Sequence, residues 1–194
     1  MSDQPPRAPH GPGKSSDSGE RLYHLRIDRD GVWHHEGRPI ARKPLVKLFA
    51  SVLRREADGD YWLVTPVERG RIEVEDVPFV VIDLIANGSG QDQTLRVKSN
   101  LDEWVAIDQD HPLRLHCPTW ASAADADSAP LPSASTPVDL PSSNPLPYVE
   151  IRPGLEGRLL RPVYYELVEL GDSHPVDGTL RYGVWSAGRF FPLD

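Results

Sequence analysis

The sequence predicts an α+β fold, made mostly of antiparallel sheets in two small related units that each hold a hairpin and one helix. Three observations lead to this fold class. Residues 71–87 contain two strand-like runs, short apolar runs alternate with turn residues through much of the chain, and two segments space their apolar residues as helices do. Because the expected strands follow one another with short turns, they favour meanders over βαβ crossovers.

Residues 71–87 form the stretch that most clearly requires burial. Its first run alternates, with Ile72 and Val74 on one face and Glu73 on the other, which suits a half-exposed strand. Its second run, residues 79–85, is apolar apart from Asp83 and is rich in β-branched residues, so it predicts a central strand covered on both faces. Pro78 separates the runs and cannot donate a ladder hydrogen bond, which predicts a turn or bulge there.

The segment before this stretch predicts a hairpin and a helix. Residues 22–36 form the hairpin, with its turn at residues 28–31. Residues 43–55 form the clearest helix, with Pro44 near its first position, where the missing N–H costs little. The predicted buried stripe of this helix is made of Leu45, Leu48, Phe49, Val52 and Leu53.

The rest of the chain predicts more strands and a second helix. Strands are expected at residues 61–67, 94–98, 103–107, 113–116 and 148–152. The second helix is expected to begin near Arg161 and to end at Gly171, which lacks a side chain and suits a helix terminus. A final hairpin covers residues 180–193, with its turn at Ala187 and Gly188.

Composition divides the chain further. Residues 1–20 are rich in Pro, Gly and Ser and predict a disordered tail. We assign residues 21–90 to an N-terminal unit and residues 91–194 to a C-terminal unit. Residues 118–147, rich in Ala, Ser and Pro, predict a mobile insertion within the C-terminal unit.

Charge and cysteine content limit the partners. A formal net charge of -8 argues against a nucleic-acid binder, which needs clustered Lys and Arg. Cys117 is the single cysteine, which excludes an internal disulfide and fits a reducing compartment. No apolar run approaches the roughly 20 residues needed to cross a bilayer. We therefore expect a cytoplasmic protein that binds neither membrane nor nucleic acid.

A short echo links the two ends of the chain. Gly31, Val32 and Trp33 are followed by Gly37 and Arg38, and residues 183–185 repeat the same three residues before Gly188 and Arg189. The echo is either chance, since Gly and aromatic residues are common around hairpin turns, or the trace of a structural repeat.

Four segments together resemble an uncharacterised group of bacterial proteins that is classed as a domain of unknown function. They are GVWHHEGRPIARKPLVKLFASVLRRE, YWLVTPVERGRIEVEDVPFVVIDL, PYVEIRPGLEGRLLRPVYYELVEL and GVWSAGRFFPL. The resemblance covers nearly all of residues 22–193 and implies two β-rich units with repeated motifs, and a part in signalling or ligand binding. It brings no catalytic residues. Residues 120–144 are longer than the connection usual in this group, which supports an insertion.

Histidines and the cysteine supply weak candidates for chemistry. His34 and His35 are adjacent on a strand and point to opposite faces, so at most one of them joins His24 in a metal site. His116 and Cys117 face apart in the same way, and no orienting partner is recognisable for a thiolate nucleophile. We therefore assign no catalytic residue, no metal ligand and no cofactor.

Arginines are the more suggestive residues. Arg38 and Arg42 precede the first helix, and Arg152 precedes the second. Either they pair with the abundant carboxylates, or some converge with aromatic side chains in a cleft between the units, where a guanidinium group binds a carboxylate or phosphate. The predicted ligand-binding residues are Trp33, Arg38, Arg42, Arg152, Tyr165 and Trp185.

These features favour a non-enzymatic ligand-binding or regulatory module that takes an anionic small molecule or peptide between the units. Two alternatives stay open: a small hydrolase or transferase with its site in the same cleft, and a protein-interaction adaptor. Titratable side chains with perturbed pKa values in a pocket would favour the enzyme. A contiguous apolar surface patch would favour the adaptor.

Overall fold

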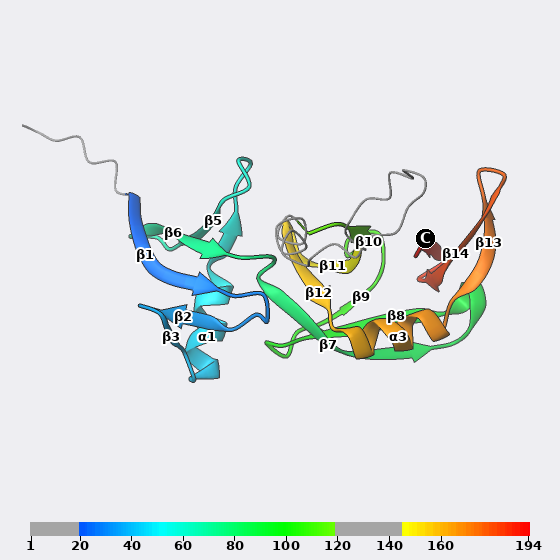
Figure 1. The fold of residues 1–194 in the computed structure, drawn as a ribbon, viewed down its shortest axis with the longest axis horizontal. Helices are drawn as coiled ribbons and strands as arrows, with labels where there is room; N and C mark the ends of the chain where they lie inside the picture. Colours follow the sequence, from blue (N-terminus) through cyan, green and yellow to red (C-terminus); the bar gives the residue numbers. More distant parts are fainter. Residues whose placement is uncertain (1–19, 119–144) are drawn as a thin grey trace, which may run out of the picture.

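The computed structural model describes residues 20–118 and 145–194 of the chain. Residues 1–19 of the expected tail and residues 119–144 of the expected insertion lie outside this part. Figure 1 shows an elongated arrangement, with the first sheet and α1 at one end, the second sheet in the middle and a small third sheet at the other end.

The first sheet has six strands in the order β3-β2-β1-β6-β5-β4, and one helix connects β3 to β4. The elements are β1 (Glu20–Ile27), β2 (Trp33–His35), β3 (Arg38–Pro39), α1 (Lys43–Ser51), β4 (Leu53–Arg55), β5 (Tyr61–Val64) and β6 (Arg69–Val74).

The second sheet also has six strands, in the order β10-β11-β12-β7-β8-β9, and the third sheet has three, in the order β13-β14-β15. The second sheet contains β7 (Phe79–Asn87), β8 (Thr94–Ser99), β9 (Trp104–Ala106), β10 (Leu113–His116), β11 (Leu146–Arg152) and β12 (Leu155–Leu159). A short 3-10 turn, η1 (Gly90–Asp92), precedes β8. The remaining elements are α3 (Arg161–Glu169), β13 (Asp172–Val176), β14 (Thr179–Ser186) and β15 (Arg189–Pro192).

The two large sheets share one topology. Adding six to each strand number of the first sheet gives the order of the second, read from the opposite edge. Each sheet consists of two antiparallel three-stranded meanders, joined at the centre by a parallel pair, β1 with β6 and β7 with β12. The expectation of two related units with mostly antiparallel pairing is confirmed, and the two parallel pairs are the exceptions that sequence reasoning did not foresee.

The sequence echo does not mark this repeat. Trp33 lies on β2 of the first sheet, whereas Trp185 lies on β14 of the third. What the two segments share is a tight turn with positive φ at both central residues, Glu36 and Gly37 in one and Ala187 and Gly188 in the other. This backbone matches the twist of a hairpin and favours glycine, so the echo reflects local turn chemistry.

The first predicted helix is shorter than expected. It ends at Ser51, and residues 53–55 form β4 instead, because their backbone groups pair with β5 in the register Leu53↔Leu63. The predicted buried stripe is confirmed in part, since Leu53 is fully buried while Leu45, Phe49 and Val52 are half-buried. Val46 and Ala50 are the buried residues of α1, whereas Leu48 is 61% exposed. The second helix agrees with its prediction, since α3 spans Arg161–Glu169 with Pro162 in its first turn.

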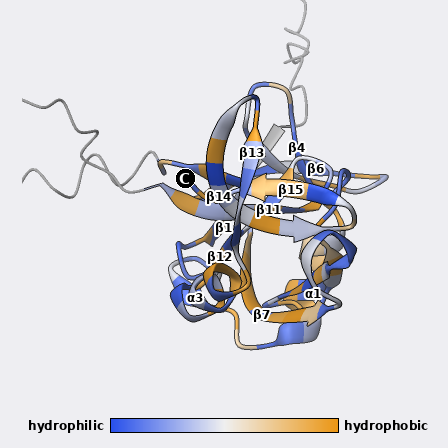
Figure 2. Ribbon diagram, turned by 90° about the vertical axis from the view of Figure 1, so that its right-hand side faces the viewer, coloured by the Kyte–Doolittle hydropathy of each residue, from blue (hydrophilic) through white to orange (hydrophobic). Residues whose placement is uncertain are grey.

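Strand β7 has the central position that was predicted for it, but only its first part is covered on both faces. Residues 79–81 are buried, whereas Ile82 and Ile85 are 42% and 43% exposed. Helix α3 packs on β7, and Figure 2 shows hydrophobic colouring along much of that strand. Strand β13 was not expected from the sequence, because residues 172–176 are mostly polar and contain Pro175.

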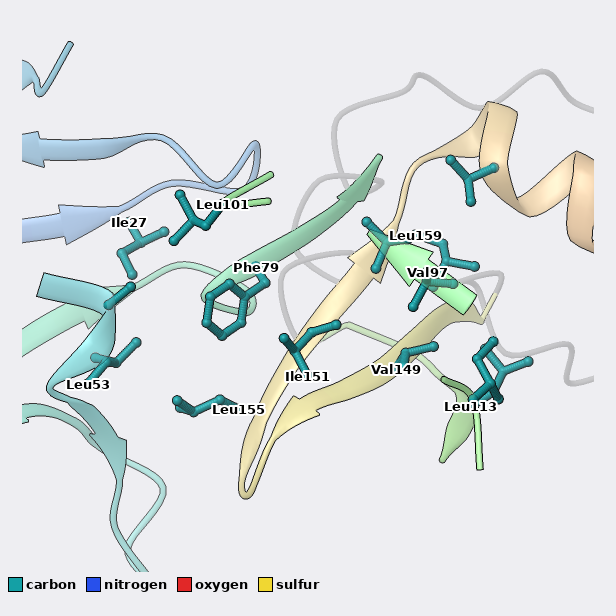
Figure 3. Close-up of a cluster of buried hydrophobic side chains, with 14 of the residues drawn as sticks. Ile27, Leu53, Phe79, Val97, Leu101, Leu113, Val149, Ile151, Leu155 and Leu159 are labelled. Atoms are coloured by element: carbon teal, nitrogen blue, oxygen red, sulfur yellow. The ribbon is translucent and has the colours of Figure 1, made fainter. Parts of the chain in front are cut away.

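The chain passes from the first sheet to the second at Pro78, and not between residues 90 and 91, where the sequence analysis divided it. The pairing of β7 with β8 and β12 decides this, because both partners belong to the second sheet. One hydrophobic core spans the junction, and Figure 3 shows Ile27 and Leu53 of the first unit facing Phe79 and Leu155 of the second.

A largely buried ion pair closes the same junction. The Asp76 side chain is 6% exposed and accepts hydrogen bonds from Arg158 Nε at 2.9 Å and from the Tyr148 hydroxyl at 3.0 Å. Arg158 also donates to the Arg29 carbonyl at 2.6 Å, which ties the β1–β2 turn to the second unit. Burial, followed by the nearby Asp76 carboxylate, raises the pKa of Tyr148. Within the described residues, no helix has the length and apolar character needed to span a membrane.

Candidate functional site

An apolar pocket lies in the first unit, between the inner face of the sheet and α1. Its volume is about 530 Å³, within the range usual for small-molecule sites. The apolar part of its lining is Leu25, Ile40, Leu45, Phe49, Val52 and Leu63. The polar part is Tyr23, His24, His35, Thr65 and Glu68.

Strand register places the sheet side of this pocket. Leu25 pairs with His35, and directly opposed residues of an antiparallel pair project from the same face. Tyr23, two residues before Leu25 on the same strand, also lines the pocket. The Tyr23 hydroxyl donates to Glu68 Oε2 at 2.9 Å, and this hydrogen bond connects β1 to the β5–β6 turn.

Gly70 on β6 makes room for the Tyr23 ring. A Cβ atom added at Gly70 would overlap three carbons of that ring. We therefore expect Gly70→Ala to displace Tyr23 and to lower the free energy of unfolding by about 1–3 kcal/mol, as overpacking does. Urea unfolding measures this loss. In a Tyr23→Ala background the clash is absent, so Gly70→Ala should lower the free energy of unfolding by clearly less. Equal costs in both backgrounds would show that Tyr23 does not occupy this space.

The helix side of the pocket carries an apolar stripe that the protein leaves partly uncovered. Leu45, Phe49 and Val52 lie on successive turns of α1 and its C-terminal cap, and all three line the pocket while staying half-buried. The sequence predicted this stripe as core. Val46 and Ala50 are the buried residues of the helix, so these three side chains are left half-buried at the pocket.

Three of the predicted ligand-binding residues belong to the first unit. Trp33 is 1% exposed and stacks on Phe49 with ring centroids 6.0 Å apart, so it supports the pocket wall from behind. Its Nε1 has no hydrogen-bond acceptor among the described residues. Arg38 is exposed on β3, and Arg42 is exposed at the N-cap of α1.

Arg152 connects the units and is not a free cation. Its Nε and one terminal nitrogen contact the Glu103 carboxylate at 2.9 and 2.6 Å, and the other terminal nitrogen donates to the Ala50 carbonyl at 2.7 Å. The Ala50 carbonyl lies at the C-terminal end of α1, where a cation is favoured by the helix dipole. Arg152 of the second unit therefore caps the helix of the first.

A groove of about 500 Å³ lies beside this cap, lined by Ser51, Leu53, Arg54, Arg152 and Leu155, with Pro153. It matches the position predicted for an anion site between the units. Arg54, however, donates to the carbonyls of Ser51 and Leu53, at 3.3 and 2.6 Å. Both arginines of this groove thus serve helix and strand carbonyls, so the groove is a structural junction.

Tyr165 and Trp185 lie away from the other predicted residues. Tyr165 is 61% exposed on α3, and Trp185 packs edge-on against His174 in the third sheet, with ring centroids 4.8 Å apart. Strands β2 and β14, which carry Trp33 and Trp185, stand at opposite ends of the molecule (Figure 1). The six predicted residues therefore form no single cleft.

Three of the histidines have separate partners. His34 Nε2 lies 2.8 Å from Asp28 Oδ2, His111 Nδ1 lies 2.8 Å from the Glu150 carbonyl, and His116 stacks on Tyr148. Across residues 20–118 and 145–194, no group of three or more His, Cys, Asp or Glu side chains is placed to hold a metal ion.

Comparison with known proteins agrees with this two-part architecture. Residues 15–77 match the model described as "Domain of unknown function (DUF1285), N-terminal domain". Residues 78–122 and 135–193 match "Protein of unknown function (DUF1285), C-terminal domain". The division falls at Pro78, where the sheets change. The unmatched residues 123–134 lie in the segment that was predicted to be an insertion. No curated protein matched the chain.

Two solved structures are similar. A DUF1285 family protein from Silicibacter pomeroyi DSS-3 is 35% identical, with a TM-score of 0.70, over 90% of this chain and 80% of that one. A DUF1285 family protein from Shewanella baltica OS155 is 23% identical, with a TM-score of 0.52, over 78% of this chain and 94% of that one, and shows likeness of fold. The resemblance noted in the sequence is thereby confirmed, and the chain belongs to the DUF1285 family.

Proposed function

We propose that this protein is a ligand-binding module and that the pocket of the first unit takes a small molecule with an apolar body. The single observation that carries the proposal is the uncovered stripe of α1. Leu45, Phe49 and Val52 are half-buried and also line a pocket of about 530 Å³. Covering apolar surface with a ligand removes it from water at a gain of roughly 25 cal/mol per Å², so an apolar molecule of fitting size binds there.

The position of α1 supports a regulatory role for this binding. One side of the helix lines the pocket, while Lys43 and Lys47 each place Nζ 2.8 Å from Asp102 Oδ2 of the second unit. Hydrogen bonds from these two lysines hold the pKa of Asp102 well below its usual range. Arg152 fastens the other end of the helix through the Ala50 carbonyl. A ligand that moves α1 therefore also changes the distances in these contacts between α1 and the second unit.

Filling the pocket tests the proposal. Leu45→Trp places a larger side chain in the cavity and is expected to weaken binding of the neutral apolar dye N-phenylnaphthylamine by roughly tenfold or more, which corresponds to about 1.4 kcal/mol. Dye fluorescence during titration measures the affinity. The matched control is Leu48→Trp, which adds the same side chain at a 61% exposed position of the same helix outside the pocket lining.

The proposal requires that wild type and Leu48→Trp bind the dye with similar affinity while Leu45→Trp does not. Thermal unfolding of the three proteins checks that each is folded. If a folded Leu45→Trp protein binds the dye as tightly as wild type does, the pocket is not the binding site.

A further inference from the structure

We infer that the ligand of this pocket carries an anionic head group, of the carboxylate or phosphate type, which is held by Arg38. The inference rests on the proposed function and specifies its ligand class. The β2–β3 hairpin forms one side of the pocket. Arg38 lies directly opposite His35 in the register of this hairpin, and His35 lines the pocket.

Register fixes the face from which Arg38 projects. Opposed residues of an antiparallel pair project from one face, so Arg38 shares the pocket face with His35. Ile40 is two residues further along, shares this face by alternation and also lines the pocket. Arg38 is itself exposed and outside the pocket lining, but it lies next to two lining residues, where its side chain can reach the mouth of the pocket. The tight turn at Glu36 and Gly37 joins the two strands directly and keeps this register.

The charge of Arg38 is available to a ligand. The guanidinium has no hydrogen-bond or ion-pair partner among residues 20–118 and 145–194. Several other cations of the first unit are paired, since Lys43 and Lys47 contact Asp102 and Arg69 contacts Glu56. A guanidinium offers several N–H donors in a planar fork, which fits carboxylate and phosphate oxygens.

The acidic residue that lines the pocket, Glu68, lies on the side away from Arg38, which favours one orientation of the bound ligand. Glu68 sits in the turn before β6, and β6 is three strands away from β3 in the sheet order. Three inter-strand steps of about 4.8 Å separate these strands. An anionic head at Arg38 thus avoids Glu68, while an apolar tail lies along Leu25, Phe49 and Leu63 between the two ends.

Competition with the neutral dye tests the head group. Decanoate, decanol and decylammonium share one apolar chain and differ in head charge. For wild type, decanoate is expected to displace the dye at a concentration roughly fivefold lower than decanol, the upper end for a solvent-exposed ion pair. Decylammonium should be weaker than decanol. Added salt should reduce the preference for decanoate, because an exposed charge pair is screened.

Matched variants assign the effect to one residue. Arg38→Gln should bring decanoate to the affinity of decanol and leave decanol unchanged. Arg189→Gln is the control, because Arg189 is an exposed arginine directly after the equivalent tight turn in the third sheet. It removes the same charge and should keep the fivefold preference.

The possible failures can be told apart. If decanoate and decanol compete equally for wild type, the pocket stands as an apolar site and the head-group inference is overturned. A preference that survives in Arg38→Gln, or that disappears equally in Arg189→Gln, overturns the assignment to Arg38. If neither the dye nor any decyl compound binds to wild type, the proposed function itself fails.

Discussion

Replacing Asp76 with alanine is expected to lower the free energy of unfolding by about 3 kcal/mol, the lower end for buried pairs, because it leaves a largely buried guanidinium without its counter-ion. The Arg158 side chain is 15% exposed and the Asp76 side chain 6% exposed, so water replaces little of the lost interaction. The substitution also removes the acceptor of the Tyr148 hydroxyl. Urea unfolding followed by circular dichroism measures the effect.

Asp60→Ala provides the control for this prediction. Asp60 pairs with Arg71 at 2.7 Å, but the two side chains are 32% and 54% exposed. An exposed pair of this kind contributes at most about 1 kcal/mol. Similar losses for Asp60→Ala and Asp76→Ala would contradict the view that the Asp76 ion pair closes the junction between the units.

The second large effect is expected at Arg152. Arg152→Met keeps an unbranched side chain near the Phe79 ring but removes the contacts with Glu103 and the cap on the Ala50 carbonyl. Hydrogen bonds to charged groups are worth about 1.5–3 kcal/mol each. Because this site is partly exposed, we expect a total loss of about 2–3 kcal/mol. Dye affinity should fall as well, since α1 forms a wall of the pocket.

Arg69→Met is the matched control for Arg152→Met. Arg69 also pairs with a carboxylate, that of Glu56, and lies over an aromatic ring, that of Trp62. It lies within the first unit and makes no contact across the junction in these pairs. We expect a loss of at most about 1 kcal/mol and unchanged dye affinity. Unchanged dye affinity in a destabilised Arg152→Met protein would contradict the coupling of pocket and junction through α1.

Local sequence signals predicted much of the secondary structure. The hairpin turns at residues 28–31 and 187–188 and the helix starting at Arg161 depend on neighbouring residues, such as Gly188 and Pro162, whose effect is local. Residues 53–55 were assigned to a helix because Leu53 continues the helical spacing. Backbone pairing with β5 overrides that preference, and this pairing cannot be predicted from the local sequence pattern.

The candidate site was harder to predict for a related reason. The apolar stripe of α1 is visible in the sequence, but its periodicity cannot distinguish a filled core from an open cavity. Arg152 was predicted to bind a ligand, but its guanidinium contacts Glu103 and Ala50, which are 49 and 102 positions away in the sequence. Arg38 follows a recognisable turn, and only the strand register places it opposite His35, a residue that lines the pocket.

The most direct test of the central proposal is a nuclear magnetic resonance titration of methyl-labelled Leu and Val residues with decanoate. We predict that the signals of Leu25, Leu45, Val52 and Leu63, which line the pocket, shift with one common affinity. The signals of Leu113 and Val184, buried in the second and third sheets, should stay in place. Shifts that leave Leu45 and Leu63 unchanged, or that gather in the second and third sheets, would contradict the proposal that this pocket is the ligand site.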